Sequence, residues 1–137
     1  MLPGAVPDPG KFRFRSWTFR RHARVMKPCV VQLDEVPAQP CPCGSVRRGF
    51  VNLPGGMASL HLVEIQGEAA LHHHDRTTEL YLVLEGVGFV ELDGERIPVR
   101  PGTAIYIPPG VRHRAVGTLR LINVPVPAFD PRDEFLD

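Results

Sequence analysis

The sequence predicts an all-β fold built from short strands. Its 15 prolines and 13 glycines separate short apolar runs at close, regular spacing, and none of these runs has the 3.6-residue period of an amphipathic helix. With 137 residues, the chain has the length of one domain, which would bury about two-thirds of the surface that its unfolded chain exposes. These features are typical of a β-sandwich or a β-barrel.

The individual strands follow from composition and from turn residues. Apolar and β-branched residues predict strands over 58–66 and 80–86, and Asp93-Gly94 predicts a hairpin between 87–92 and 95–99. A short buried strand is expected over 103–107, and two more over 111–116 and 119–124, separated by Gly117-Thr118. The tail is predicted to hold one short helical turn after Pro131.

The basic residues are concentrated at the N-terminus. Residues 1–25 carry six lysines and arginines against one aspartate, so this part has a charge of +5 while the whole chain has only +1. Aromatic residues alternate with the basic ones. We interpret 1–25 as an arm that packs on its own fold or on a neighbour, in preference to an arm that binds nucleic acid or lipid. It could also lie upstream of the natural start, because Met26 opens a segment that resembles a new N-terminus. Residues 26–137 then form the single barrel domain.

The chain shows no sign of export or of membrane insertion. The arm has no apolar run long enough for a signal peptide, and no segment approaches the ~20 apolar residues of a membrane span. We therefore expect a cytoplasmic protein with neither a nucleic acid nor a membrane as partner. The three cysteines, Cys29, Cys41 and Cys43, are an odd number without a secretion signal, which argues against a disulfide framework. Cys41-Pro-Cys43 is too tightly spaced for a zinc knuckle, so we expect two reduced thiols.

Three adjacent histidines are the most informative feature. Side chains alternate faces along a strand, so His72 and His74 point to one side and His73 to the other. The segment Asp75–Thr78 has the composition of a turn. This turn allows Glu79 to open the next strand and to point back toward the His72 and His74 pair.

A fourth histidine completes a possible metal site. His113 follows a tight turn in the segment PPGVRH, and in a closed barrel its strand can lie beside that of His72. Three imidazoles and one carboxylate suit a divalent transition metal with positions left open for water or substrate. These ligands do not distinguish iron, manganese, nickel, zinc and copper.

The spacing of these residues resembles the cupin superfamily. The segment His72-x-His74-x4-Glu79-x6-Gly86 resembles the first cupin motif, and Gly102-x5-Pro108-x-Gly110-x2-His113 resembles the second. The resemblance covers about residues 59–124. Within the superfamily, the chain is similar to small microbial single-domain cupins. The chain departs from the pattern in having one residue fewer between Gly67 and His72, and in having Gly117 where an asparagine is frequent. Neither position is a ligand.

The resemblance implies a double-stranded β-helix, also called a jelly-roll barrel, with a metal near its centre. His72, His74, Glu79 and His113 match the ligands of the family one for one. Cupins are usually dimeric, so a homodimer is expected. The outward stripe of Leu80, Leu82 and Leu84 needs a cover, which the arm or a second subunit could provide.

Three further residues are candidates for catalysis. Tyr81 is expected to face inward and to lie near the metal, either as a proton donor or as a wall residue with a satisfied hydroxyl. Either His61 or Glu64 faces the interior, because their positions differ in parity, and the inward one is a candidate general base. The sequence does not choose between these two.

The fold does not determine the function. Our first hypothesis is a metal-dependent oxidoreductase, similar to a dioxygenase, that acts on a small polar organic molecule. The first alternative is a non-enzymatic cupin that binds or senses a small ligand or the metal itself. The second alternative is a sugar or phosphosugar isomerase. It is less favoured because arginines after residue 26 lie mostly in turns or at outward positions, whereas a phosphate needs inward cations.

Overall fold

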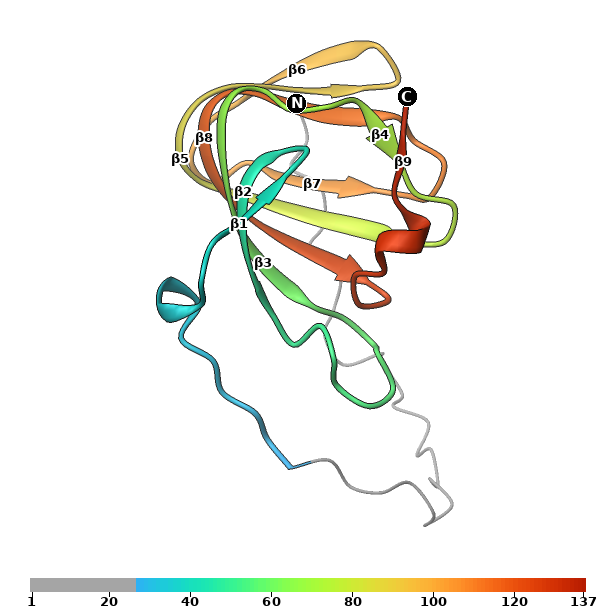
Figure 1. Ribbon diagram of the computed structural model, residues 1–137. Coiled ribbons are helices and arrows are strands. Elements are labelled where there is room, and N and C mark those ends of the chain that lie inside the picture. The colour runs from blue at the N-terminus through green and yellow to red at the C-terminus, as the bar shows by residue number, and fades with distance from the viewer. Residues whose placement is uncertain (1–26) are drawn as a thin grey trace, which may run out of the picture.

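The protein is described by a computed structural model that covers residues 27–137 (Figure 1). Short strands dominate this part of the chain, with two short 3₁₀ turns. In chain order the elements are η2 (Leu33–Glu35), β1 (Gln39–Cys41), β2 (Gly44–Gly49), β3 (Leu60–Glu68), β4 (His72–His73), β5 (Thr78–Leu92), β6 (Glu95–Val99), β7 (Ala104–Ile107), β8 (His113–Val126), η3 (Pro131–Asp133) and β9 (Phe135–Leu136).

Two long antiparallel strands, β5 and β8, form the spine of the sheet. They pair from Thr78 opposite Val126 to Leu92 opposite His113. Strand β3 pairs with the other edge of β8, and β7 and β6 pair with successive parts of β5. The strands curl around a common interior (Figure 1). The structure therefore confirms the all-β barrel fold.

Strands β5 and β8 are longer than the sequence predicts. The segments 80–86 and 87–92 belong to one strand, and so do 113–116 and 119–124. Gly86 and Gly117 lie inside these strands, where β5 and β8 pair closely, instead of ending them. Gly86 has a φ of 99°, and a Cβ there would overlap the carbonyl oxygen of Thr118. Glycine permits both the positive φ and the close approach.

Alternation along β5 separates the interior from the surface. Tyr81 and Val83 are buried, whereas Leu80, Leu82 and Leu84 are 39%, 43% and 38% exposed. This is the division that the two-residue period predicts. The leucine stripe is partly exposed among the described residues, and both the arm and the homodimer stay predictions for what covers it.

The turns confirm two expectations and correct one. Asp93-Gly94 connects β5 to β6 as a hairpin, and η3 is the helical turn expected after Pro131. The expectation of two reduced thiols is wrong for this structure, because Cys41 and Cys43 form a disulfide. The turn between β1 and β2 brings the two sulfurs together, with Cys41 opposite Gly44.

The N-terminal arm, residues 1–25, lies outside the described residues. None of the helices within 27–137 has the length and apolar character needed to cross a membrane.

Candidate metal centre

Four side chains from separate segments meet at one end of the barrel. His72 lies on β4 directly opposite His113, the first residue of β8. His74 follows β4, and Glu79 lies near the start of β5. One potential ligand atom from each of these four residues lies within 4.8 Å of the other three. Metal–ligand bonds of about 2.1 Å put two ligand atoms at most about 4.2 Å apart, so a movement of roughly half an ångström would close the group around an ion.

The backbone selects the tautomer of all three imidazoles. The Nδ1 atoms of His72, His74 and His113 lie 3.0, 2.7 and 2.8 Å from the carbonyl oxygens of Ala70, Asp133 and Val111, respectively. A carbonyl oxygen only accepts, so each Nδ1 carries the proton and donates. In the neutral rings each Nε2 then presents a lone pair, as metal ligation requires.

Glu79 faces two of these Nε2 atoms. Its Oε2 lies 2.8 Å from Nε2 of His113, and its Oε1 lies 3.5 Å from Nε2 of His74. The His74 Nε2 is buried and has no hydrogen-bond partner among the described residues. Neutral imidazoles would set lone pairs against a carboxylate, an arrangement that needs either a proton or a cation between them. The donor set therefore fits a divalent cation and could hold one.

The pKa values agree with a buried, charged centre. Burial lowers the pKa of His72 to about 4, with a further contribution from His113. Burial alone would raise the pKa of Glu79, but the hydrogen bond with His113 and the nearby His74 ring hold it well below its usual range. His72 is therefore a neutral candidate ligand at neutral pH and Glu79 is an anionic one.

Two more side chains orient the carboxylate. The Tyr81 hydroxyl donates to Oε2 of Glu79 at 3.2 Å, and Nδ2 of Asn123 donates to Oε1 at 2.6 Å. Tyr81 thus lies beside the candidate ligands, and its hydroxyl is satisfied by one of them. Asn123 was missed from the sequence, although its alternation along β8 could have placed it inside.

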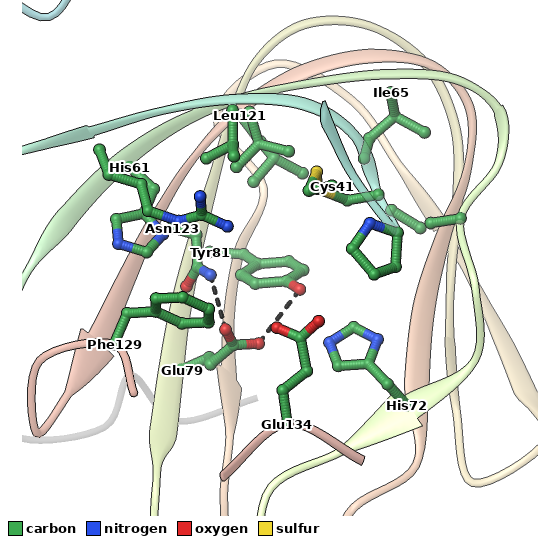
Figure 2. A pocket seen from close by; sticks show the side chains of 17 residues that line it. Cys41, His61, Ile65, His72, Glu79, Tyr81, Leu121, Asn123, Phe129 and Glu134 are labelled. Carbon is green, nitrogen blue, oxygen red and sulfur yellow. Dashed lines mark hydrogen bonds between the residues drawn. A yellow bond between two sulfur atoms is a disulfide. The ribbon is translucent and has the colours of Figure 1, made fainter. Parts of the chain in front are cut away.

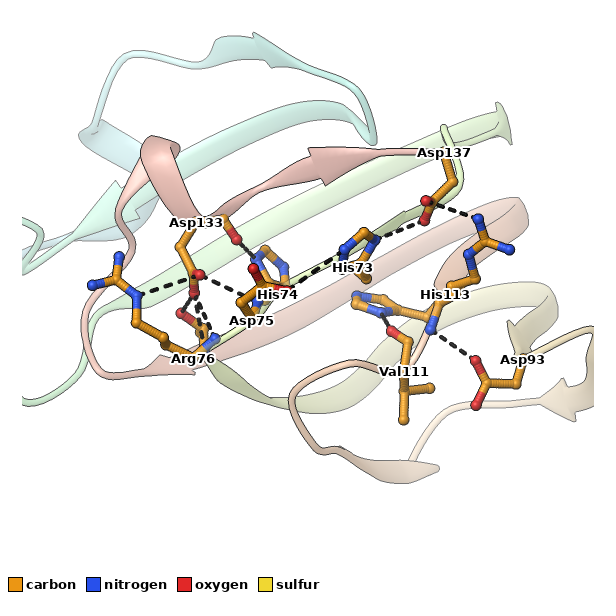
Figure 3. Close-up of polar contacts among 11 residues, drawn as sticks. His73, His74, Asp75, Arg76, Asp93, Val111, His113, Asp133 and Asp137 are labelled. Atoms are coloured by element: carbon orange, nitrogen blue, oxygen red, sulfur yellow. Dashed lines mark hydrogen bonds and ion pairs between the residues drawn. The ribbon is translucent and has the colours of Figure 1, made fainter.

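The structure decides which residue of β3 faces inward. His61 is buried, lines the cavity and is held by Oγ of Ser59 at 2.9 Å. Glu64 is exposed on the outer face, 4.0 Å from Arg120. Glu64 is thus not a candidate general base for this site, because odd-numbered residues of β3 point into the barrel. His73 points away from the centre, as expected, and contacts Asp137 at 2.9 Å (Figure 3).

A cavity adjoins the four candidate ligands and includes His72 and Glu79 in its wall (Figure 2). One part of its wall is apolar and includes Val63, Ile65 and Leu121. Three residues that the sequence reasoning missed also line it: Arg48, Phe129 and Glu134. Burial raises the pKa of Glu134.

The C-terminal tail braces the site. The buried Asp133 carboxylate accepts hydrogen bonds from the backbone N–H groups of Asp75, Arg76 and Thr77 at 3.0 to 3.2 Å, and from the Thr77 hydroxyl at 2.7 Å (Figure 3). Its backbone carbonyl accepts from His74. Asp133 therefore holds both the turn between His74 and Glu79 and the His74 ring. Nothing in the sequence around Asp133 indicated this contact.

Known proteins share the fold and part of the sequence. The cupin domain family matches residues 59–124. A crystal structure of a protein from Planctomyces limnophilus is 40% identical, with a TM-score of 0.76 over 80% of this chain and 96% of that one. The protein MJ1618 of Methanocaldococcus jannaschii is 40% identical over 39% of this chain and 42% of its own length. Across the curated relatives, the chain spans 42% to 60% of their length.

More distant structures support the fold alone. Pac13 from Streptomyces, a nucleoside dehydratase, is 19% identical and has a TM-score of 0.72 over 81% of this chain and 92% of that one. The motifs, the strand topology and the match over residues 59–124 show together that the chain belongs to the cupin superfamily.

Proposed function

We propose that the chain binds a divalent transition metal through His72, His74, Glu79 and His113, and that it uses this metal to oxidise a small polar organic molecule with dioxygen. One observation carries the proposal: three Nε2 lone pairs and one carboxylate converge on a buried point beside a cavity. A metal bound there would supply Lewis-acid polarisation of a substrate oxygen or, as iron, a binding site for dioxygen.

The protein side chains would prepare this centre. Tyr81 and Asn123 hold the Glu79 carboxylate in one orientation, and the apolar wall of Val63, Ile65 and Leu121 keeps water away from the substrate. Glu134 and His61 reach the same cavity. We infer that Glu134 is the first candidate for moving a proton, because it lines the cavity and burial raises its pKa. His61 and Tyr81 are the other candidates.

Oxygen consumption tests the proposed reaction. The full chain, freed of metal and reloaded separately with iron, manganese, nickel, copper or zinc, would be mixed with oxo acids, diketones, catechols and sugars. We expect at least one redox-active form to consume dioxygen with one of these compounds, whereas the zinc form, which has no redox chemistry, does not. Failure of every redox-active form across the panel would contradict an oxidation.

The same panel distinguishes the alternatives. An isomerase would convert a sugar without consuming dioxygen. A non-enzymatic cupin would be stabilised against heat by a compound that it returns unchanged. A phosphosugar substrate is disfavoured, because Arg48 is the one cationic side chain among residues 27–137 that lines the cavity.

The Tyr81 hydroxyl is expected to act on the metal through Glu79. Y81F removes one donor to the ligand carboxylate and should lower the metal affinity about tenfold, as is typical for partners of metal ligands. The matched control is Y106F, because Tyr106 is 67% exposed on the outer face. Metal affinity would be measured by competition with a chelator. Equal affinities in the two variants would contradict a positioning role.

A further inference from the structure

Arg48 is placed unusually for an arginine of this protein. It lies on β2 and lines the cavity. Its guanidinium carbon lies 4.4 Å from the ring centroid of Phe129, and its Nη1 donates to Oε1 of Gln39 at 3.1 Å. Its Nε is buried and has no hydrogen-bond partner among the described residues. A buried donor without a partner is costly, and an acceptor that reached the guanidinium group from the cavity would offset part of this cost.

More than half of the other arginines in residues 27–137 are paired with carboxylates. Five of them form ion pairs with carboxylates: Arg76, Arg112, Arg114, Arg120 and Arg132. Arg48 forms no such pair within residues 27–137. The nearest candidate by position is Glu134, which lines the same cavity, yet no ion pair joins the two. The planar guanidinium is thus stacked on an aromatic ring with a free donor, a geometry that suits a carboxylate.

The charges around the cavity favour a monoanion. With a divalent cation on the four ligands, the cation and Arg48 contribute three positive charges, whereas Glu79 and Glu134 contribute two negative ones. The loaded cavity then has one uncompensated positive charge. An anionic ligand of small size would cancel it, and Val63, Ile65 and Leu121 would contact an apolar body.

We propose that the ligand of this cavity is a small carboxylic acid with an oxo or hydroxyl group, and that Arg48 binds its carboxylate while the oxygen of that second group faces the metal. This inference rests on the proposed function and names its substrate class. It makes Arg48 a specificity-determining residue that selects acids over neutral analogues.

Matched acids and esters test this assignment. The metal-loaded full chain would be titrated calorimetrically with pyruvate, 2-oxobutyrate and 2-oxoisovalerate, and with the methyl ester of each. We expect at least one acid to bind about tenfold or more tightly than its ester, since charged hydrogen bonds are the strong ones. In R48Q that preference should disappear, and in R48K it should be only partly restored, because lysine lacks the planar fork.

R96Q is the control, because Arg96 also stacks over a phenylalanine, Phe89, at 4.6 Å but lies outside the cavity wall. R96Q should keep the full preference for acids. Acids and esters that bind equally, an unchanged preference in R48Q, no binding of any acid to the loaded chain, or tighter binding of inorganic phosphate than of the acids would each overturn the inference. Metal content and the circular dichroism melt of every variant are measured separately. Loss of metal in the unmodified chain would count against the proposed function, whereas a metal-loaded chain without acid preference counts against Arg48 alone.

Discussion

Replacing His72 by alanine is expected to lower the affinity for a divalent metal by about 100-fold or more. Changes to the partners of metal ligands already cost about 10- to 100-fold, and H72A removes a ligand itself. His72 is half-buried at the cavity wall, so its truncation should leave the barrel folded. The measurement is metal content after dialysis, with a chelator competition that gives the dissociation constant.

The adjacent histidine is a matched control. H73A removes the same side chain from the same strand, but His73 points to Asp137 and Phe135 instead of the ligand group. H73A should therefore bind metal as the unmodified chain does. Equal losses in the two variants would mean that a general effect of the histidine run, and not the convergence of four ligands, explains metal binding.

Asp133 is expected to have the largest effect on stability of any single polar residue at the site. D133A removes a buried acceptor and leaves the buried N–H and hydroxyl groups of Thr77 without a partner. Unsatisfied buried donors cost about 1–3 kcal/mol each, so we expect a loss of about 3 kcal/mol or more. For a domain of this size the melting temperature should fall by roughly 10 °C. D130A is the control, because the Asp130 carboxylate lies in the same tail and contacts only Arg76 and Arg132, so its loss as the cap of η3 should cost only about 1 kcal/mol.

The pH dependence of the stability gives an independent check on the role of Asp133. Burial would raise the pKa of Asp133, but hydrogen bonds from Thr77 and from the backbone N–H groups of Arg76, Asp75 and Thr77 outweigh burial and lower it. A group whose pKa is lowered in the folded state stabilises above the pKa of the unfolded chain, and this contribution is lost as the pH falls through the folded pKa. The stability difference between the unmodified chain and D133N should thus shrink below a pH of about 4. A constant difference down to pH 2 would contradict this role.

Local alternation explains what could be predicted. A two-residue period is a property of the strand backbone, so the inward positions of Tyr81 and Val83 and the outward leucines follow from sequence order alone. The opposition of His72 and His73 follows in the same way. The segment between His74 and Glu79 predicted a turn, and in the structure β4 ends before this segment and β5 begins at its end.

Long-range contacts explain what was missed. Gly86 and Gly117 each have the local signature of a turn, but the close pairing of β5 with β8 leaves no room for a Cβ at either position, and both strands continue through them. Cys41 and Cys43 looked like separate thiols until the β1–β2 turn brought them together. His61 and Glu64 differ only in parity, and pairing of β3 with its neighbours had to choose between them.

The sequence by itself therefore determined the fold class and the four candidate ligands, because both depend on spacing within short segments. Only the tertiary structure decided how the cavity is lined. Arg48, Glu134 and the bracing carboxylate of Asp133 come from segments far apart along the chain. Their proximity depends on how strand β2 and the C-terminal tail pack against the rest of the sheet, and no local sequence pattern predicts that packing.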